Sequence, residues 1–379
     1  MCRTRRAAAW GRAWRRRGCE DIILFTKTID FLMKNACVNI RYLVQRDMMK
    51  IPVDTPEMQS MQAELLQSPV VQKCLSAQRT DGWLGHELHG GDGMDSLMGV
   101  LLRSGLEAKS VPVQKAVNAL VTPEIAGQHK SHFAAGDALD ADGRGGNRSI
   151  TAWILSTTGF PEDKQPLSDE INLALGHLYG SRAYNSIDDF TKQGTKFRYY
   201  KPAVMFPGAN HIEILRNTHS WQSRENLQTA KKSMENCYAI VKDIEGYIMF
   251  RKPKEFGGSY MGPFNYDWQS LNPIETHDLL RMVNNPKNRF QFGFYIRSLG
   301  RHPMWAIQTA QPYEFFADML EKDTLMDNMT DKALSGFKYL WGIEPNWRNK
   351  TSVKCDLTYR ILDTCWPYNL SAPSSAQCL

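Results

Sequence analysis

The sequence "LSAQRTDGWLG" (residues 75–85) places a tryptophan between two glycines, directly after an apolar run with helical character. Glycine tolerates positive φ angles, so Gly82 and Gly85 predict a sharp change in chain direction. A turn by itself does not need Trp83, because a large aromatic ring stabilises a structure mainly by packing. We therefore interpret this segment as a turn that ends one helix near Gln78 and holds it against a following helix through the stacked Trp83 ring.

The sequence on both sides of this turn predicts many helices joined in pairs. Three segments place a capping residue before a proline, which favours a helix start at that proline: Thr55-Pro56, Ser68-Pro69 and Thr122-Pro123. Apolar residues recur at helical spacing in four more segments: 166–180, 223–241, 331–342 and 355–366. Alternating strand patterns are scarce, so the predicted class is all-α with ten or more helices. Two Gly-rich segments, 134–147 and 250–268, are expected to be long functional loops.

The basic charge of the chain is concentrated at its N-terminus. The formal net charge is +6, yet residues 1–17 contain seven arginines and no acidic residue, so the remainder has a net charge of −1. This distribution argues against a nucleic-acid-binding face. The arginine-rich tail is compatible with a transit-like presequence, a polyanion-binding segment or an unstructured extension, and we favour the extension. The predicted organisation is a basic extension (1–32), one helical domain (33–368) and a C-terminal tail (369–379).

Cysteine usage and hydropathy indicate the compartment. Eight cysteines are scattered without a Cys-x-x-Cys pair, which argues against a disulfide framework or a thiolate zinc site. Buried free thiols in a reducing compartment are the expected alternative. The apolar stretch "DIILFTKTIDFLM" is interrupted by Lys27 and Asp30 and is too short to cross a bilayer. The sequence therefore predicts a cytoplasmic protein without a transmembrane segment.

Two further stretches follow the opening turn in a recognisable order. "QRTDGWLG" (78–85) is followed by "HGGDGMDSLMGVLL" (89–102), and this pair resembles the repeat of the α/α-toroid proteins, the squalene-cyclase and prenyltransferase group. The segments "FPGANHIEILRNTHSW" (206–221) and "WGIEPNWRNKTSVKCDLTYRIL" (341–362) are similar to an uncharacterised, prenyltransferase-like branch. The resemblance covers roughly residues 37–366. It implies an α/α toroid, in which paired inner and outer helices surround a central cavity that holds a small-molecule ligand.

The motifs that define activity within this group are missing or altered. The group's protonating cyclases use Asp-x-Asp-Asp, whereas the nearest strings here are "DADG" (140–143) and "SIDDF" (186–190). The Asp-Asp-x-x-Asp motif of ionising terpene synthases is absent, and the Asp, Cys and His zinc ligands of protein prenyltransferases cannot be placed. The resemblance therefore implies a scaffold with a cavity, and it specifies neither a reaction nor a cofactor, metal or oligomeric state.

The first candidate site follows the opening turn. His86, His89, Asp92 and Asp95 lie close together in sequence, and histidine with nearby carboxylates suits metal binding or acid–base chemistry. The alternative is a solvated loop in which Asp95 caps a helix. We select His89 and Asp95 as candidate catalytic residues, and Trp83 as a candidate substrate-binding residue.

The second candidate site is the acidic loop "DALDADGRGGN" (137–147). Its alternating carboxylates resemble calcium-loop chemistry, but the spacing fits no EF-hand, and a flexible acidic loop is the favoured interpretation. Arg144 and Arg148 are expected to pair with these acids. Arg148 is also a candidate substrate-binding residue.

The third candidate site opens the predicted helix after "KPAVMFPGA" (201–209). Asn210, His211 and Glu213 stand at its start and Trp221 lies just beyond its end. Helix N-termini suit polar ligands because their N–H groups are unsatisfied. We select His211 as catalytic and Asn210, Glu213 and Trp221 as substrate-binding, although a structural histidine at a helix start is the competing interpretation.

The fourth candidate site combines His277 with upstream aromatics. His277 lies at the start of "ETHDLLRMV" (275–283), and Tyr266 and Trp268 precede this segment. Aromatic side chains at the mouth of a cavity can stack on sugars or stabilise cations. We select His277 as catalytic and Tyr266 and Trp268 as substrate-binding, against the alternative of hydrophobic loop closure. By contrast, Asp356 and Arg360 stand one helical turn apart and are expected to form a structural salt bridge.

These candidate residues are compatible with three functions. The preferred one is a prenyltransferase- or terpene-cyclase-like protein acting on an isoprenoid or another apolar substrate. The second is a carbohydrate-acting or carbohydrate-binding toroid that would use two carboxylates, such as Asp95 and Glu213. The third is a non-catalytic helical scaffold, for which a cavity without convergent polar groups is expected.

Overall fold

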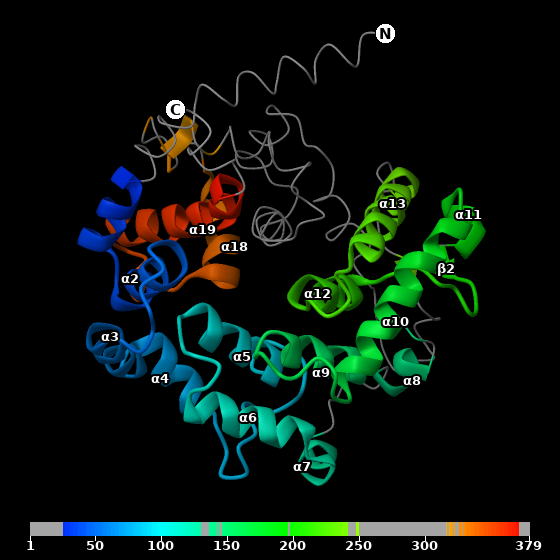
Figure 1. Ribbon diagram of the computed structural model, residues 1–379, viewed down its shortest axis with the longest axis horizontal. Coiled ribbons are helices and arrows are strands. Elements are labelled where there is room, and N and C mark those ends of the chain that lie inside the picture. Colours follow the sequence, from blue (N-terminus) through cyan, green and yellow to red (C-terminus); the bar gives the residue numbers. More distant parts are fainter. Residues whose placement is uncertain are drawn as a thin grey trace. The chain divides into compact units, whose positions relative to one another are not determined.

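Helices make up most of the described chain in the computed structural model (Figure 1). The structure describes residues 26–129, 136–141, 143, 146–195, 198–241, 248–249, 316, 318–320, 322, 326–327 and 329–370. The chain divides into two compact units. Unit 1 comprises residues 1–61, 274–301 and 309–379, and unit 2 comprises residues 62–273 and 302–308. The helix α3 (Pro56–Leu66) contains the boundary between them.

Unit 1 is organised around the long C-terminal helix. Its further elements are α2 (Val38–Leu43), the π-helical segment η1 (Val44–Met48), α18 (Asp331–Trp341) and α19 (Lys350–Leu370). Because α19 packs on α2 and η1, its fully buried Leu357 and Ile361 share one apolar core with Ile40 and Val44. Residues 26–35 are also helical, and Leu32 is fully buried in this core, so the predicted domain boundary at residue 33 falls inside a helix.

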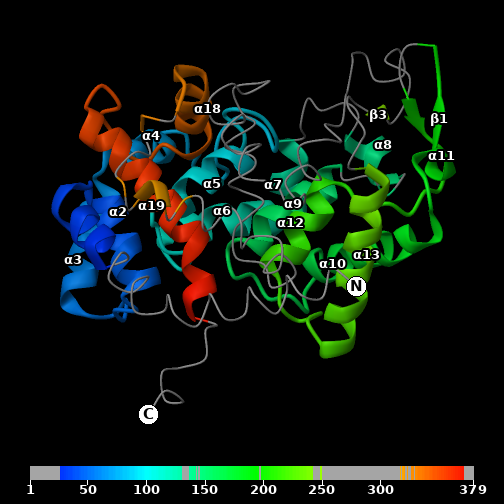
Figure 2. The ribbon, with the colours of Figure 1, turned by 90° about the horizontal axis from the view of Figure 1, so that it is seen from above.

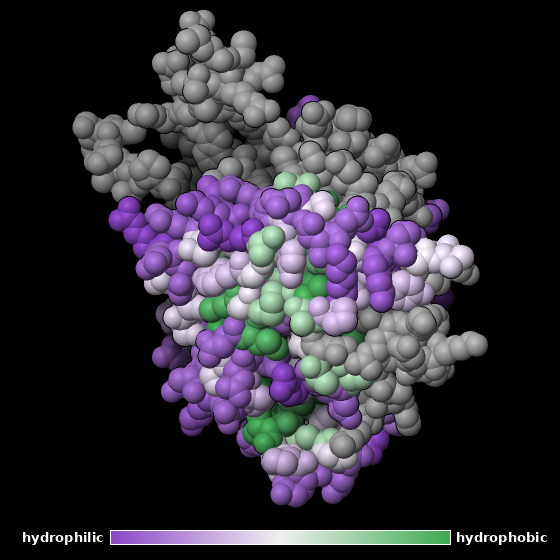
Figure 3. Space-filling view, turned by 90° about the vertical axis from the view of Figure 1, so that its right-hand side faces the viewer, coloured by the Kyte–Doolittle hydropathy of each residue, from purple (hydrophilic) through white to green (hydrophobic). Residues whose placement is uncertain are grey.

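Unit 2 contains the other helices that the structure describes. They are α4 (Pro69–Leu75), α5 (Met94–Arg103), α6 (Val111–Val121), α7 (Pro123–Gln128), α8 (Gly136–Ala141), α9 (Asn147–Ser156), α10 (Leu167–Gly180), the 3-10 turn η2 (Ser181–Ala183), α11 (Ile187–Phe190), α12 (Ala209–Asn217) and α13 (Arg224–Val241). The predicted proline starts are confirmed, because α3, α4 and α7 begin at Pro56, Pro69 and Pro123. The side of unit 2 that carries α11 and α13 is mainly hydrophilic, with small apolar areas between polar side chains (Figure 3).

Three helices of unit 2 pack in a row and begin in the same way. The helix α5 packs on α9, and α9 packs on α12, while α10 contacts α9, α12 and α13. Each helix of the row starts directly after a glycine, namely Gly93, Gly146 or Gly208. The second residues of these helices are Asp95, Arg148 and Asn210, so three predicted site residues occupy equivalent positions. This row agrees with the expected repeat of helix pairs, whereas closure of the pairs into a ring stays a prediction.

A small sheet is the exception to the predicted all-α class. The strands β1 (Thr191–Gln193) and β2 (Arg198–Tyr200) pair antiparallel, and β3 (Ile248–Met249) joins β2 in parallel. Figure 2 shows β1 next to α11, whose Phe190 is fully buried. Strands of two or three residues are too short to produce a recognisable alternation, which explains why the sequence pattern does not predict them.

The expected long loop at 134–147 is partly wrong. Residues Gly136–Ala141 form the helix α8, and α8 packs on the start of α9. Gly146 explains the close approach, because a Cβ atom added there would lie only 1.9 Å from the carbonyl oxygen of Gly136. Asp137 and Asp140 thus belong to a helix that packs against its neighbour, whereas Asp142 lies outside the described residues. The second expected loop, 250–268, lies outside the described residues.

Candidate functional site

The opening turn has the predicted form. Gly82 and Gly85 have φ angles of +92° and +86°, and a short antiparallel bridge joins Gln78 to Leu84. The Gln78 amide donates to the carbonyl oxygens of Gly82 (3.2 Å) and Pro112 (2.8 Å), which connects the turn to the first residues of α6. Trp83 is only 1% exposed. The Gln-to-Trp segment is therefore a packed connection between helices.

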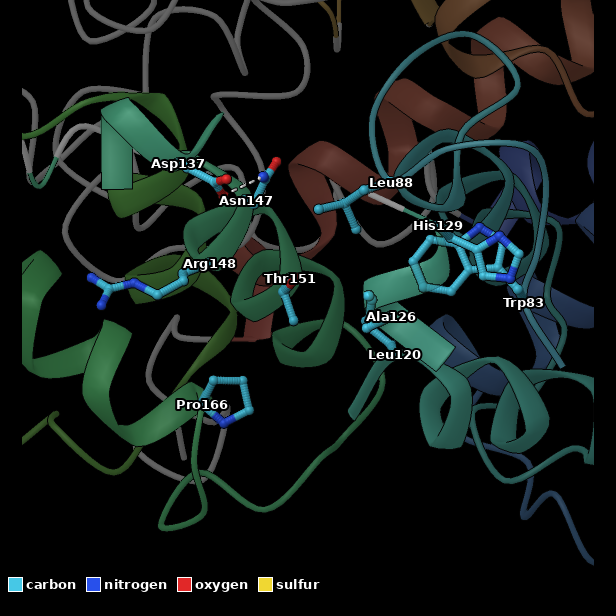
Figure 4. Close-up of a pocket in the computed structure, with 11 residues that line it drawn as sticks. Trp83, Leu88, Leu120, Ala126, His129, Asp137, Asn147, Arg148, Thr151 and Pro166 are labelled. Carbon is cyan, nitrogen blue, oxygen red and sulfur yellow. Dashed lines mark hydrogen bonds between the residues drawn. The ribbon is translucent and has the colours of Figure 1, made fainter. Parts of the chain in front are cut away.

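A cavity of about 250 Å³ lies beside this turn, within unit 2 (Figure 4). The side that carries Trp83 is formed mainly by apolar groups, and the lining residues there include Leu88, Leu120 and Ala126, whereas Pro166 lies on the opposite side with Arg148 and Thr151 (Figure 4). The predicted ligand contact of Trp83 is thus geometrically possible. The Trp83 Nε1 atom is buried and has no hydrogen-bond acceptor in the described part of the chain, so this indole contributes through its ring surface.

His129 is a lining residue that the sequence analysis did not select. Its ring stacks on Trp83 with centroids 4.6 Å apart and an interplanar angle of 21°. Its Nε2 atom lies 2.8 Å from Asp81 Oδ2, across 48 residues of sequence. The backbone N–H of Trp83, two residues along the chain, donates to the other carboxylate oxygen, Asp81 Oδ1, at 2.9 Å. The hydrogen bond with His129 lowers the pKa of the Asp81 carboxyl. Asp81 and the Trp83 ring together fix the orientation of the imidazole.

The polar side of the cavity is formed by α8 and α9. Asn147 Nδ2 donates to Asp137 Oδ1 at 3.1 Å, and Thr151 lies one turn further along α9. Arg148 also lines the cavity, but Figure 4 shows its guanidinium turned away from Trp83 and His129. Arg148 Nε lies 3.3 Å from Oε1 of the buried Glu170. Arg148 therefore forms an ion pair with Glu170 in α10, although its side chain is 60% exposed.

The expected pairing of Arg148 with the acidic segment 137–142 is partly correct. The Arg148 backbone N–H donates to Asp140 Oδ2 at 2.9 Å, whereas the guanidinium pairs with Glu170. Burial raises the pKa of the Asp140 carboxyl, and the hydrogen bond from Arg148 opposes this shift. Asp140 thus acts as a cap at the start of α9. Arg144 lies outside the described residues.

His89 and Asp95 are brought together. His89 Nδ1 lies 2.6 Å from Asp95 Oδ2, and Asp95 is only 5% exposed. Asp95 Oδ1 accepts N–H groups from Ser96 (2.7 Å) and Gly90 (3.3 Å), which holds the carboxylate at the start of α5. The hydrogen bond to Asp95 raises the pKa of the half-exposed His89. The pair has the geometry of an oriented acid–base group and also caps the helix.

The residues predicted around α12 have internal partners. Gly208 N donates to His211 Nδ1 at 3.1 Å, and the His211 ring, 1% exposed, stacks on His177 with centroids 4.6 Å apart. Glu213 Oε1 lies 3.3 Å from Arg216 Nη1. His211 therefore stabilises the helix start in the interior, and this geometry favours the structural interpretation. The Asn210 side chain is half-buried at the second position of α12.

Trp221 is also an interior residue. It is 4% exposed, and its Nε1 donates to the Leu215 carbonyl oxygen at 3.0 Å. None of Asn210, His211, Glu213 and Trp221 lines the cavity next to Trp83. The predicted residues His277, Tyr266 and Trp268 lie outside the described residues.

The expected salt bridge between Asp356 and Arg360 in unit 1 is wrong. The Asp356 carboxylate accepts the N–H groups of Ile343 (2.9 Å) and Glu344 (3.0 Å) and the indole N–H of Trp347 (2.6 Å). Arg360 instead pairs with Asp363 at 3.1 Å. Asp356 thus holds the segment between α18 and α19 in place through three hydrogen bonds. These donors explain why an acidic residue is buried at this point.

The part of the chain that the structure describes shows neither a metal cluster nor a membrane-spanning helix. No cluster of three or more His, Cys, Asp or Glu side chains there has a geometry that could hold a metal ion. No helix in this part of the chain combines the length and apolar character needed to cross a bilayer.

Comparisons with protein-family models, curated proteins and solved structures found no match to this chain. The toroid resemblance therefore still depends on the sequence stretches that carry it.

Proposed function

We propose that the cavity beside Trp83 binds a small, mainly apolar, uncharged molecule, such as a short isoprenoid alcohol, and that unit 2 is part of an α/α-toroid-like scaffold. The observation that carries this proposal is the lining itself: a wall of apolar side chains and a stacked ring pair faces a rim with few polar groups. Cavities of this composition are the usual sites for small apolar ligands. The row α5, α9 and α12 supports the scaffold, because each helix repeats the same glycine start.

The size of the cavity limits the ligand. A cavity of about 150 Å³ accommodates benzene, so the volume of about 250 Å³ corresponds to roughly ten carbon atoms. A five- or ten-carbon prenyl chain can be enclosed in this space, whereas a triterpene-sized substrate would extend beyond it. The proposal therefore concerns the short members of the isoprenoid class.

The charges around the cavity favour an uncharged ligand over a prenyl diphosphate. Among the lining residues that the structure describes, Arg148 has its guanidinium paired with Glu170 and Asp137 contributes a carboxylate. A diphosphate would need unpaired cations or a bound metal to offset the loss of its hydration. A hydroxyl group loses much less hydration free energy on burial than a diphosphate does.

Ligand-observed NMR with prenyl alcohols of five, ten and fifteen carbons, and with geranyl diphosphate, tests the proposal. At about 0.5 kcal/mol for each non-hydrogen atom, a ten-carbon alcohol would bind with about 5 kcal/mol, which is a Kd of about 0.2 mM. We expect binding of the five- and ten-carbon alcohols and weaker or no binding of the other two compounds.

Two phenylalanine variants on α7 locate the binding. Ala126→Phe places a ring in the cavity lining and should abolish binding. Gln128→Phe adds the same ring to an exposed position of the same helix outside the lining, and it should leave binding unchanged. The proposal is refuted if the wild-type protein binds no alcohol, or if Ala126→Phe binds as well as the wild type.

A further inference from the structure

Two histidines form a stack in the interior of unit 2, away from the lining of the proposed ligand site. His177 of α10 and His211 of α12 are 2% and 1% exposed, and their ring centroids lie 4.6 Å apart with an interplanar angle of 15°. The main chain also comes close, because a Cβ atom added to Gly143 would lie 3.0 Å from His177 Nε2. Water therefore has little access to either imidazole.

The hydrogen bond at the start of α12 determines the protonation state of His211. The Gly208 N–H donates to His211 Nδ1 at 3.1 Å, so Nδ1 uses its lone pair as an acceptor. An imidazolium carries an N–H group at both nitrogens and has no acceptor. The observed bond thus requires a neutral ring with its proton on Nε2. Protonation would set two N–H groups against each other and leave a buried cation stacked on a second imidazole.

The carboxylates on the neighbouring helices already have partners. The helix α12 packs on α9 and α10. Besides the two histidines, the ionisable side chains of these three helices are Arg148, Asp169, Glu170, Tyr179, Glu213 and Arg216. Glu170 pairs with Arg148 at 3.3 Å. Glu213 pairs with Arg216 at 3.3 Å, and Asp169 is exposed. A protonated His211 would therefore have to compete with an arginine for Glu170 or Glu213.

We propose that the His177–His211 stack is a pH-sensitive contact, which holds α12 on α10 at neutral pH and releases the start of α12 when His211 is protonated. The closed arrangement requires neutral His211, whereas an opened segment exposes the ring to water, where it can bind a proton. Acid therefore shifts the equilibrium toward the open form, and this shift is absent well above the ordinary histidine pKa of about 6.5. The helix α12 should thus open at a higher pH than helices of unit 2 that contain no histidine.

Hydrogen exchange of the peptide that covers α12 tests the proposal. Observed rates divided by the intrinsic rates at each pH give the equilibrium constant for opening, provided that the helix recloses faster than it exchanges. With a pKa of about 6.5 in the open form, this constant should rise about thirtyfold between pH 7.5 and pH 5.0. The peptide of α6, which contains no histidine, is the internal reference for unfolding of the whole unit and should change much less.

Two asparagine variants separate His211 from the other histidines. His211→Asn keeps an acceptor oxygen close to the position of Nδ1 and removes the titrating group, so the thirtyfold rise should disappear. His219→Asn removes an exposed histidine just beyond the end of α12 and should retain the full rise. Histidine-selective ¹⁵N NMR of the wild type, with His211 identified by its ring contact with His177, should show the neutral Nε2–H tautomer at pH 7.5.

Three outcomes would overturn the proposal. The first is an opening constant of α12 that does not change between pH 7.5 and pH 5.0 in the wild type. The second is an equal rise in His211→Asn or in the α6 peptide, because release would then be independent of His211 or not local. The third needs only the wild type and decides the question even if His211→Asn does not fold: an imidazolium signal from His211 at pH 5.0 while α12 stays protected from exchange.

Discussion

Replacing Asp356 by asparagine should remove a large pH dependence of the stability of unit 1. The carboxylate is 1% exposed, and burial raises its pKa from 3.8 to about 7, although Ile343 N, Glu344 N and Trp347 Nε1 donate to the ionised form. Because the folded pKa is higher than the unfolded value, folding is favoured most below about pH 4, and this contribution is lost as the pH rises through 7. A shift of about 3 units corresponds to about 4 kcal/mol between these limits.

The measurement compares wild type with Asp356→Asn at several pH values from 4 to 8. Since the chain has two units, the local free energy of opening is best taken from hydrogen exchange of peptides in α18 and α19. The local free energy of opening of the wild type minus that of Asp356→Asn should fall by about 4 kcal/mol as the pH rises from 4 to 8. The Trp347 indole N–H signal, assigned with Trp347→Phe, should titrate near pH 7 in parallel. A titration midpoint below pH 5, or a stability difference that does not change with pH, would refute the reasoning.

Three further predictions concern unit 2. Gly82→Ala should lower the free energy of unfolding by about 2 kcal/mol or more, because φ is +92° and the added Cβ would lie 2.6 Å from the Lys115 carbonyl oxygen; denaturant titration against wild type measures it. Glu162→Gln should cost about 1 kcal/mol in the same assay, since this side chain accepts the backbone N–H groups of residues 219–220 and an amide has one acceptor oxygen in place of two. The Cys237 thiol, whose pKa is raised to about 12 by burial, should react with a maleimide only after denaturant is added, and rapid labelling of the native protein would contradict this.

The helices and the opening turn were predictable because their signals are local. A capping residue before proline fixes a helix start within one turn, and α3, α4 and α7 begin where this rule places them. The positive φ angles of Gly82 and Gly85 likewise follow from the sequence between two helices. The pairing of His89 with Asp95 was also within reach, since only six residues separate them.

The contacts that define the cavity were not predictable in this way. His129 and Asp81 are 48 residues apart, and His129 belongs to no motif, so only the packing of the end of α7 against the opening turn brings it to Asp81. The local spacing of Asp356 and Arg360 favoured an ion pair, but the unsatisfied N–H groups after α18 compete for the same carboxylate. A buried acid surrounded by three donors gains more from them than from one neighbouring cation.

The row α5, α9 and α12 explains why a repeated pattern predicts where a residue lies in its helix better than it predicts what its side chain contacts. Asp95, Arg148 and Asn210 all follow a glycine and one further residue, so the backbone presents each of them at the same point of its helix. Their surroundings differ, because Asp95 binds His89 and Arg148 pairs with Glu170. A repeat preserves the geometry of the main chain, whereas the partner of each side chain comes from a different loop or helix. Candidate residues at equivalent positions therefore have to be judged one by one, and the cavity-lining His129 belongs to no repeat position at all.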